Sequence, residues 1–417
     1  MPVLVRALSS AAHRTAAPVA GPDEGAARVL AHPGGPLRVI GGPGTGKTTL
    51  LARTVADRIV RRKVDPEHVL VLTANRRAAV DLRERITELL AAGGSVRTVR
   101  EPLVRTVHSY AFAVLRLQSS LYEQPPPRLL SGPEQDVVVR DLLAGDVADG
   151  SGRWPVRLRP ALGLPAFAAE LRDLVLRAAE RGLGPEDLVS LGREHRRDEW
   201  VAVGRFFRAY EQVMLLRGSV GTGAPEATAP ALDAAELVSE ALLTLETDPE
   251  VLRRERNRVR HLYVDDAQHL DPQQARLVRL LGAGSDELLL LGDPDQTVFS
   301  FRGADPGLLT CGEQPLVRLA TDRRMSPAVR TAMRRLAARL PGSRLGELHG
   351  PDGEAPEGGE VAVRVFRSAA SEAGWVADRL RRAHLLDGVA WADMAVLVRS
   401  TARSLPVLRR ALLAAGV

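Results

Sequence analysis

The sequence predicts an α/β protein with a mostly parallel, doubly wound sheet and a helical insertion within the fold. Three observations support this prediction. Short apolar runs alternate with helical stretches, the strand signal fades between about residues 119 and 231, and a glycine-rich turn links the first apolar run to a helix. At 417 residues, the chain is long enough for two or three domains.

The expected elements follow the chain in order. Buried strands are expected at six apolar runs, namely Leu37–Ile40, Val69–Leu72, Leu262–Val264, Leu288–Leu291, Val361–Phe366 and Met394–Val398. Helices are expected at Asp81–Ala91, Pro133–Leu143, Pro165–Arg181, Glu199–Leu216 and Ala373–Ala383. Ser371 is the expected N-cap of the last helix. Gly218–Asp233 is rich in Gly, Ala, Pro and Thr, and is expected to be the linker that leaves the insertion.

The composition excludes several classes of protein. With 45% hydrophobic and 26% charged residues, the chain is typical of a soluble globular protein. No run approaches the roughly 20 apolar residues of a membrane-spanning helix. The single cysteine cannot form an internal disulfide, so a cytoplasmic protein is expected. The cysteine and the nine histidines show no metal-ligand spacing. The net charge of +6 supports nucleic-acid binding only weakly.

The strongest motif is the glycine-rich turn after the first apolar run. It fits the pattern G-x-x-x-x-G-K-[ST], and the candidate nucleotide-binding residues are Gly41, Gly42, Pro43, Gly44, Thr45, Gly46, Lys47, Thr48 and Thr49. Its glycines let backbone N–H groups surround phosphate oxygens, while Lys47 reaches the β- and γ-phosphates and Thr48 offers a hydroxyl to Mg²⁺. The alternative is a structural turn. Lysine occurs elsewhere only at Lys63, which favours the functional interpretation because arginine replaces a compact ammonium poorly among phosphates.

A second carboxylate site follows the apolar run at 262–264. Asp265 and Asp266 stand at the expected carboxyl end of a strand, where Asp265 would hold Mg²⁺ and Asp266 would orient or deprotonate the attacking water. The alternative is an ordinary acidic turn at a strand end. The presence of the phosphate-binding turn favours the catalytic interpretation.

A polar loop with two aromatic residues follows the apolar run at 288–291. Gln296 in this loop could sense a γ-phosphate, and Phe299 and Phe301 could present their faces to nucleic-acid bases. The alternative for both phenylalanines is core packing. Aromatic residues make up only 4% of the chain, so two of them around one serine beside a polar loop are notable.

These segments together resemble superfamily 1A DNA helicases of the UvrD/PcrA/Rep type. The resemblance rests on motifs that occur in the family order: 41–48 for motif I, 73–79 for Ia, 106–111 for Ib, 265–268 for the DExx box, 292–304 for III and 321–324 for IV. Trp391–Arg399 continues the likeness.

The resemblance implies a motor of two RecA-like lobes that bind ATP and Mg²⁺ between them. The expected domains are lobe 1A at 1–118 and 232–312, helical subdomain 1B at 119–231, and part of lobe 2A at 313–417. Arg324 would contact the γ-phosphate. Such motors translocate 3′ to 5′ on single-stranded DNA, separate duplex DNA and act in repair or recombination. The residues expected to line the DNA path are Thr73, Arg76, Arg77, His108, Phe299 and Phe301.

Several positions depart from the family pattern. Asp266 stands where the family has glutamate, and Ala74 replaces a base-stacking aromatic residue. The adenine-reading glutamine before the phosphate-binding turn is not evident at 22–24. Because aspartate is one methylene shorter, water held for attack could lie out of reach. An alternative function is therefore a non-hydrolysing scaffold subunit that clamps DNA in a helicase–nuclease complex. A third is a P-loop regulator without a DNA role.

A narrower resemblance is to the AdnA-type motor–nuclease subunits, which pair with an AdnB-type motor subunit. It rests on the DDAQ residues at 265–268, the arginine-rich composition and the loop at 73–79. The family's motifs V and VI are not found before Val417, so the sequence is expected to be a fragment that hydrolyses ATP hardly at all by itself. A nuclease domain would follow Val417.

Overall fold

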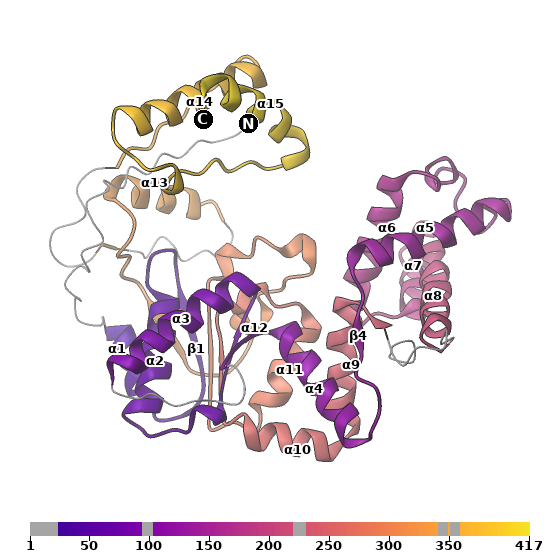
Figure 1. Cartoon of the computed structure of the whole chain (residues 1–417), viewed down its shortest axis with the longest axis horizontal. Helices are drawn as coiled ribbons and strands as arrows, with labels where there is room; N and C mark the ends of the chain where they lie inside the picture. The colour runs from indigo at the N-terminus through magenta and orange to yellow at the C-terminus, as the bar shows by residue number, and fades with distance from the viewer. Residues whose placement is uncertain (1–23, 94–102, 220–230, 341–348, 351–358) are drawn as a thin grey trace. The chain divides into compact units, whose positions relative to one another are not determined.

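The structure is a computed structural model that describes residues 24–93, 103–219, 231–340, 349–350 and 359–417 (Figure 1). The chain divides into two compact units. One contains residues 25–41 and 47–319, and the other contains residues 42–46 and 320–417. None of the helices within the described ranges combines the length and the apolar character needed to cross a membrane.

A six-stranded parallel sheet forms the centre of the first unit. Its order is β3-β2-β6-β7-β1-β8. The bounds are β1 Gly35–Gly41, β2 Val69–Thr73, β3 Val104–Thr106, β6 His261–Val264, β7 Glu287–Gly292 and β8 Leu316–Leu319. All neighbouring strands pair in parallel, which confirms the predicted sheet type. The short strands β3 and β8 were not predicted, and β8 extends the sheet beyond the expected domain boundary at residue 312.

Two hydrophobic cores cover opposite faces of this sheet. Leu262 and Val264 of β6 belong to one core, whereas Tyr263 belongs to the other, as the alternation of side chains along a strand requires. The first core includes α4 (Val107–Leu121), α9 (Ala234–Thr247), α10 (Pro249–Arg258) and α11 (Pro272–Gly282). The second includes α1 (Glu24–Ala31), α2 (Lys47–Val60) and α3 (Arg76–Ala92). Helices on both faces confirm the doubly wound arrangement.

Polar side chains fix where several helices begin. Asn75 accepts a hydrogen bond from a backbone N–H in the first turn of α3, and Asp233 does the same for α9. In the second unit Ser368, not the predicted Ser371, caps α14 (Ala369–Leu385). The short elements that complete the described chain are α12 Gly307–Thr310, η1 Pro66–His68, η2 Arg159–Ala161, η4 Ala267–His269, η5 Pro294–Gln296, η6 Ser300–Arg302 and η8 Trp391–Asp393.

The predicted helical insertion is present. Its helices are α5 (Gly132–Ala148), α6 (Pro165–Ala179), α7 (Pro185–Glu194) and α8 (Asp198–Ser219), and they share a core of their own around Trp154 and Phe206. The chain enters and leaves beside two paired strands, β4 (Arg128–Leu129) and β5 (Ala231–Leu232). Most of the predicted exit linker lies outside the described residues.

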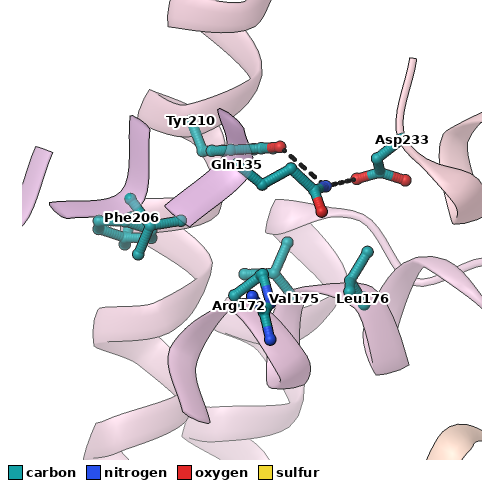
Figure 2. A pocket seen from close by; sticks show the side chains of 8 residues that line it. Gln135, Arg172, Val175, Leu176, Phe206, Tyr210 and Asp233 are labelled. Atoms are coloured by element: carbon teal, nitrogen blue, oxygen red, sulfur yellow. Dashed lines mark hydrogen bonds between the residues drawn. The ribbon is translucent and has the colours of Figure 1, made fainter. Parts of the chain in front are cut away.

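A small cavity lies among α5, α6 and α8 (Figure 2). At its wall Gln135 Nε2 donates hydrogen bonds to Tyr210 Oη at 3.3 Å and to Asp233 Oδ2 at 3.0 Å. Because Asp233 also caps α9, these bonds fasten the insertion to the first turn of a helix that supports the sheet.

The second unit differs from its prediction. It contains α13 (Pro327–Ala337), α14 and α15 (Thr401–Ala415), but the expected strands at Val361–Phe366 and Met394–Val398 are irregular. Val365 and Leu397 are 72% and 89% exposed, and neither segment pairs with a strand in the described parts of the chain. An apolar run forms a strand only where neighbouring strands satisfy its backbone, which explains the difference. The partial RecA-like lobe at 313–417 therefore stays a prediction.

A buried ion pair joins α2 to the beginning of β7. Arg58 donates to both carboxylate oxygens of Glu287, at 2.9 Å and 2.7 Å, and Tyr263 Oη donates to the same carboxylate at 2.6 Å. Burial alone would raise the pKa of Glu287, but His261, Arg58 and Tyr263 outweigh this effect and lower the pKa to about 2. The carboxylate therefore adds stability above its unfolded-state pKa, and this contribution is lost as pH falls from about 4.5 to about 2.

Glu287→Gln should remove the carboxylate charge that Arg58 Nε and Nη2 contact, leaving Asp57 as the remaining counter-charge of the buried guanidinium. We expect the free energy of unfolding at pH 7, measured by urea denaturation, to fall by about 3–5 kcal/mol. The difference from wild type should shrink as pH falls toward 2. Glu250→Gln is the control because Glu250 pairs with Arg253 and Arg254 on an exposed face of α10. An equal loss of stability in the two variants would contradict the assignment.

Candidate functional site

The candidate site lies where three parallel strands end at the same edge of the sheet. Strand β7 pairs with β1 on one side and with β6 on the other. The glycine-rich turn leaves β1 and leads into Lys47, Asp265 follows β6, and Asp293 follows β7. The carboxyl ends of parallel strands are the usual position of ligand sites in such sheets.

The glycine-rich turn has the backbone that its glycines allow. Gly44 and Gly46 have φ values of 79° and 82°, in the left-handed region that disfavours other residues. The Thr45 hydroxyl donates to the Gly42 carbonyl at 2.8 Å. Lys47 Nζ donates to the Gly41 carbonyl at 2.7 Å, at the end of β1.

A hydrogen bond joins the first turn of α2 to the end of β6. Thr48 Oγ1 donates to Asp265 Oδ2 at 2.9 Å, while Asp265 Oδ1 is buried without a hydrogen-bond partner. Burial and the neighbouring charge of Asp266 raise the pKa of Asp265 to about 6. Lys47 lies close enough to favour the charged form of Asp265.

These atoms fit the expected Mg²⁺ ion. A hydroxyl oxygen stands beside a carboxylate whose other oxygen lacks a partner, and hard oxygen ligands are those that Mg²⁺ prefers. The described residues contain no group of three or more His, Cys, Asp and Glu side chains that could hold a metal ion. Magnesium with a nucleotide needs no such cluster, because one or two protein oxygens, phosphate oxygens and water complete its coordination.

Asp266 adopts a strained backbone conformation. Its φ and ψ are 52° and 43°, in the left-handed region, and its Oδ1 accepts a hydrogen bond from Gln268 Nε2 at 3.2 Å. Aspartate tolerates this region better than most residues, and such strain concentrates at functional sites. The side chain is half-buried beside Asp265.

A polar network continues from β6 to β7. Gln268 Oε1 accepts a hydrogen bond from the Asp293 N–H at 3.0 Å, and Asp293 Oδ2 accepts one from Gln296 Nε2 at 2.6 Å. Burial raises the pKa of Asp293, while Gln296 and Lys47 oppose this shift. The network connects the candidate water-orienting residue Asp266 to the candidate γ-phosphate sensor. The linking role of Asp293 was not predicted, because it depends on side-chain direction.

Arg324 lies beside the glycine-rich turn within the second unit. The backbone N–H groups of Arg323 and Arg324 donate to the Gly44 carbonyl and to Asp322 Oδ1, both at 3.0 Å. Asp322 is buried and accepts a hydrogen bond from Arg330 Nε at 2.9 Å. A Cβ atom on Gly44 would overlap the Asp322 carboxylate, so the close approach of the two segments requires glycine.

The two predicted base-stacking residues are accessible. Phe299 and Phe301 are 36% and 69% exposed, with ring centroids 6.2 Å apart, which argues against the core-packing alternative for Phe301. The Arg302 guanidinium lies 6.0 Å and 5.5 Å from the two rings. His269 is half-buried, with its ring centroid 4.7 Å from that of Phe299. Its closeness to the site was not evident from a lone histidine.

The other predicted DNA-contact residues differ in accessibility. Thr73 is 2% exposed and its hydroxyl donates to the Asn75 carbonyl at 3.2 Å, so it does not present a free surface group. Arg76 and Arg77 are exposed in the first turn of α3, which contains no acidic residue. Positive charge there opposes the helix dipole but adds to an anion-binding surface. His108 is half-buried, and burial lowers its pKa.

Comparison with known proteins identifies a family of motor proteins. The sequence profile of the UvrD/REP helicase N-terminal domain matches residues 23–315. The chain is 27% identical over 407 residues to the ATP-dependent DNA helicase UvrD2 of Mycobacterium bovis, an alignment that covers 96% of this chain and 55% of the relative. It is 28% identical over 296 residues to the ATP-dependent DNA helicase UvrD1 of Mycobacterium leprae, covering 66% of this chain and 33% of the relative.

A more distant relative comes from another group of bacteria. The probable DNA helicase II homolog of Mycoplasma capricolum is 22% identical over 270 residues, which cover 64% of this chain and 33% of that protein. The chain thus spans at most about half the length of these relatives.

Asp265→Asn should stabilise the ligand-free protein in a pH-dependent way. Because the folded-state pKa is raised, the wild type loses stability as pH rises from about 4 to above 6. At pH 8 we expect the variant to gain about 2–3 kcal/mol in the free energy of unfolding, and at pH 4 almost nothing. Urea denaturation at both pH values measures this. Asp81→Asn, on an exposed position of α3, should show no gain. A gain that is independent of pH would show that the charge of Asp265 is not its cause.

Proposed function

Since the chain belongs to the UvrD/REP helicase family, we propose that it forms the ATP-binding part of a motor that translocates 3′ to 5′ on single-stranded DNA. The observation that carries the proposal is the Thr48–Asp265 hydrogen bond beside Lys47. It brings a hydroxyl, a carboxylate with an unpartnered oxygen and an ammonium group to the end of the glycine-rich turn. This combination suits a nucleoside triphosphate with Mg²⁺.

Each group has a distinct proposed role in nucleotide binding. Residues 41–46 surround the phosphates with backbone N–H groups, Lys47 contacts the β- and γ-phosphates, and Thr48 and Asp265 hold Mg²⁺. Thr49, whose hydroxyl lies 3.3 Å from an Arg85 guanidinium nitrogen, completes the first turn of α2. When bound, Mg²⁺ would neutralise charge on the phosphate oxygens.

Hydrolysis requires groups that act on the γ-phosphate and on water. Asp266 would orient or deprotonate the attacking water, and Gln296 would sense the γ-phosphate through its bond to Asp293. Arg324 would stabilise negative charge on the transferred group. The strained backbone of Asp266 supports an active role, since strain of this kind persists where function requires it.

The proposed DNA path combines aromatic and basic residues of the first unit. Phe299 and Phe301 would stack on bases, with the exposed Arg76 and Arg77 on phosphates and His108 nearby. The buried hydroxyl of Thr73 would support the turn before α3 through its bond to the Asn75 carbonyl. The proposed motor would separate duplex DNA and act in DNA repair. We place this role in the cytoplasm as part of the same proposal.

A finer proposal concerns the type of motor. The DDAQ residues at 265–268 and the arginine-rich composition support an AdnA-type subunit that works with a second, AdnB-like motor subunit. The mycobacterial relatives carry the names UvrD1 and UvrD2, so this finer proposal depends on the sequence motifs alone. Co-purification of the full-length protein with a second motor subunit tests it, and a purely monomeric protein would contradict it.

A second candidate function is a DNA clamp that binds ATP without hydrolysing it. The observation that favours it is the short Asp266 side chain, whose Oδ1 bonds to Gln268 rather than extending freely. This protein would bind nucleotide and DNA but release no phosphate. The following measurement separates the two functions.

Lys47→Ala should abolish nucleotide-dependent activity because it removes the ammonium group that contacts the phosphates. We expect DNA-stimulated phosphate release by the full-length protein to fall by at least about 100-fold, with weaker binding of a fluorescent ATP analogue. Lys63→Ala is a matched control, since Lys63 is the only other lysine and is exposed. Undiminished hydrolysis in Lys47→Ala would reject the site, and binding without hydrolysis in the wild type would favour the clamp.

Phe301→Ala and Arg77→Ala should weaken DNA binding in different ways. Loss of stacking at Phe301 should reduce the affinity for single-stranded oligonucleotides by about 1–3 kcal/mol with little dependence on sequence. Loss of a phosphate contact at Arg77 should lower the slope of log affinity against log salt by about one unit. Fluorescence anisotropy at several salt concentrations measures both. If neither variant differs from wild type, the proposed path is wrong.

A further inference from the structure

His269 occupies a position between the exposed aromatic residues and the candidate catalytic carboxylates. It ends the short turn η4, which begins directly after Asp266. Its ring meets Phe299 edge-on, with ring centroids 4.7 Å apart and an angle of 63° between the planes. Edge-to-face contacts of this kind are attractive and depend on orientation, so movement of one ring changes the preferred position of the other.

The His269 ring also contacts Gln268. Gln268 Nε2 lies 3.4 Å from His269 Nε2 and 3.2 Å from Asp266 Oδ1. The other end of the same amide, Oε1, accepts the Asp293 N–H, which establishes which end carries the N–H donors. His269 Nε2 must therefore act as an acceptor, which requires the neutral imidazole.

The surroundings restrict this arrangement. Burial lowers the pKa of His269 and so favours the neutral ring, although the nearby Asp266 charge opposes the shift. A Cβ atom on Gly292 would overlap Gln268 Oε1, so β7 packs directly against the amide and leaves it little room to move. The Gln268 amide is thus held on three sides, by Gly292, Asp293 and Asp266.

We propose that His269 is a positioning residue that couples base stacking at Phe299 to the carboxylate of Asp266. The proposal rests on the proposed function. A base that stacks on Phe299 fixes the orientation of the Phe299 ring, and the His269 ring adjusts to it. The Gln268 amide then adjusts its contact with His269 Nε2, and its bond to Asp266 Oδ1 changes with it. Occupation of the DNA path would thereby change the position of the group proposed to orient water.

This coupling is reciprocal because it is a free energy shared by two binding sites. If DNA at Phe299 alters the nucleotide site, a bound nucleotide must alter DNA affinity by the same factor. The factor can be measured at equilibrium without hydrolysis. It therefore remains measurable even if the protein is a clamp that does not hydrolyse ATP.

Two substitutions separate the two contacts of His269. His269→Phe keeps an aromatic ring beside Phe299 but removes the nitrogen that accepts from Gln268. His269→Asn keeps a polar group near Gln268 but removes the ring. His195 supplies the matched controls, His195→Phe and His195→Asn, because its ring also meets an aromatic residue edge-on, Trp200 at 6.2 Å, in the helical insertion.

The experiment measures the affinity of the full-length protein for a single-stranded oligonucleotide containing 2-aminopurine. Titrations are done with and without a non-hydrolysable ATP analogue and Mg²⁺, and the ratio of the two affinities is the coupling factor. We expect a wild-type factor of about 5–150 and a factor within about twofold of one in both His269 variants. DNA affinity without nucleotide should change less than about threefold in His269→Phe. The His195 variants should retain the wild-type factor.

A double-substitution cycle tests whether His269 acts through Phe299. In a Phe299→Ala background, His269→Phe should produce no further change in the coupling factor. Thermal unfolding verifies that each variant is folded, and the two His269 variants provide independent tests. Wild-type coupling that persists in both variants would overturn the inference and leave the proposed function intact. If the wild type binds neither DNA nor nucleotide, the proposed function fails and the inference fails with it.

Discussion

The parallel pairing of β6, β7 and β1 is the constraint on which the candidate site depends. Ile40 pairs with Gly292, and Val264 with Leu290, so the three strands deliver their following residues to one edge of the sheet. A slip of one residue would move every side chain of a strand to the opposite face. The ion pair between Arg58 and Glu287 resists such a slip from the other end, because it joins α2 to the first residue of β7. The ion pair at one edge of the sheet thus helps to hold the candidate site residues at the other edge.

The two buried carboxylates of this sheet contrast in their surroundings. Glu287 receives hydrogen bonds from Arg58 and Tyr263, so its charge stabilises the fold. Asp265 is also buried, but its side chain makes no ion pair at hydrogen-bond distance comparable to that of Glu287; it accepts a hydroxyl bond from Thr48, and its Oδ1 lacks a side-chain partner. A carboxylate left in this condition destabilises the folded protein at neutral pH. Its retention at the end of β6 is consistent with a ligand that supplies the missing positive charge.

Much of this fold could be predicted from the sequence because short, continuous apolar runs mark buried parallel strands. Strand β3 was missed because it contains three residues and only one apolar side chain, that of Val104, and β8 was missed because Arg318 interrupts its four residues. Val361–Phe366 was predicted as a strand from the same signal, yet pairing depends on neighbours that a local pattern does not contain. The residues of the glycine-rich turn could be predicted because their spacing along the sequence is the motif itself. The contacts of Gln268 and His269 have no such spacing, since they arise from side-chain directions across two loops.

The backbone conformation of Asp266 explains why its side chain is held by neighbouring residues. Aspartate enters the left-handed region more readily than glutamate, and its short carboxylate can bond to nearby groups. The shorter side chain also reaches less far from the end of β6, so its position depends more strongly on its neighbours. Gln268 supplies that position, and Gln268 is itself held by Asp293 and by close packing against Gly292. Asp266, one of the positions that depart from the family pattern, is therefore tied to the surrounding loops through Gln268. Because the Asp266 side chain is short, its position relative to the γ-phosphate would depend on the conformation of these loops. The loop that carries Phe299 and Phe301 is one of them.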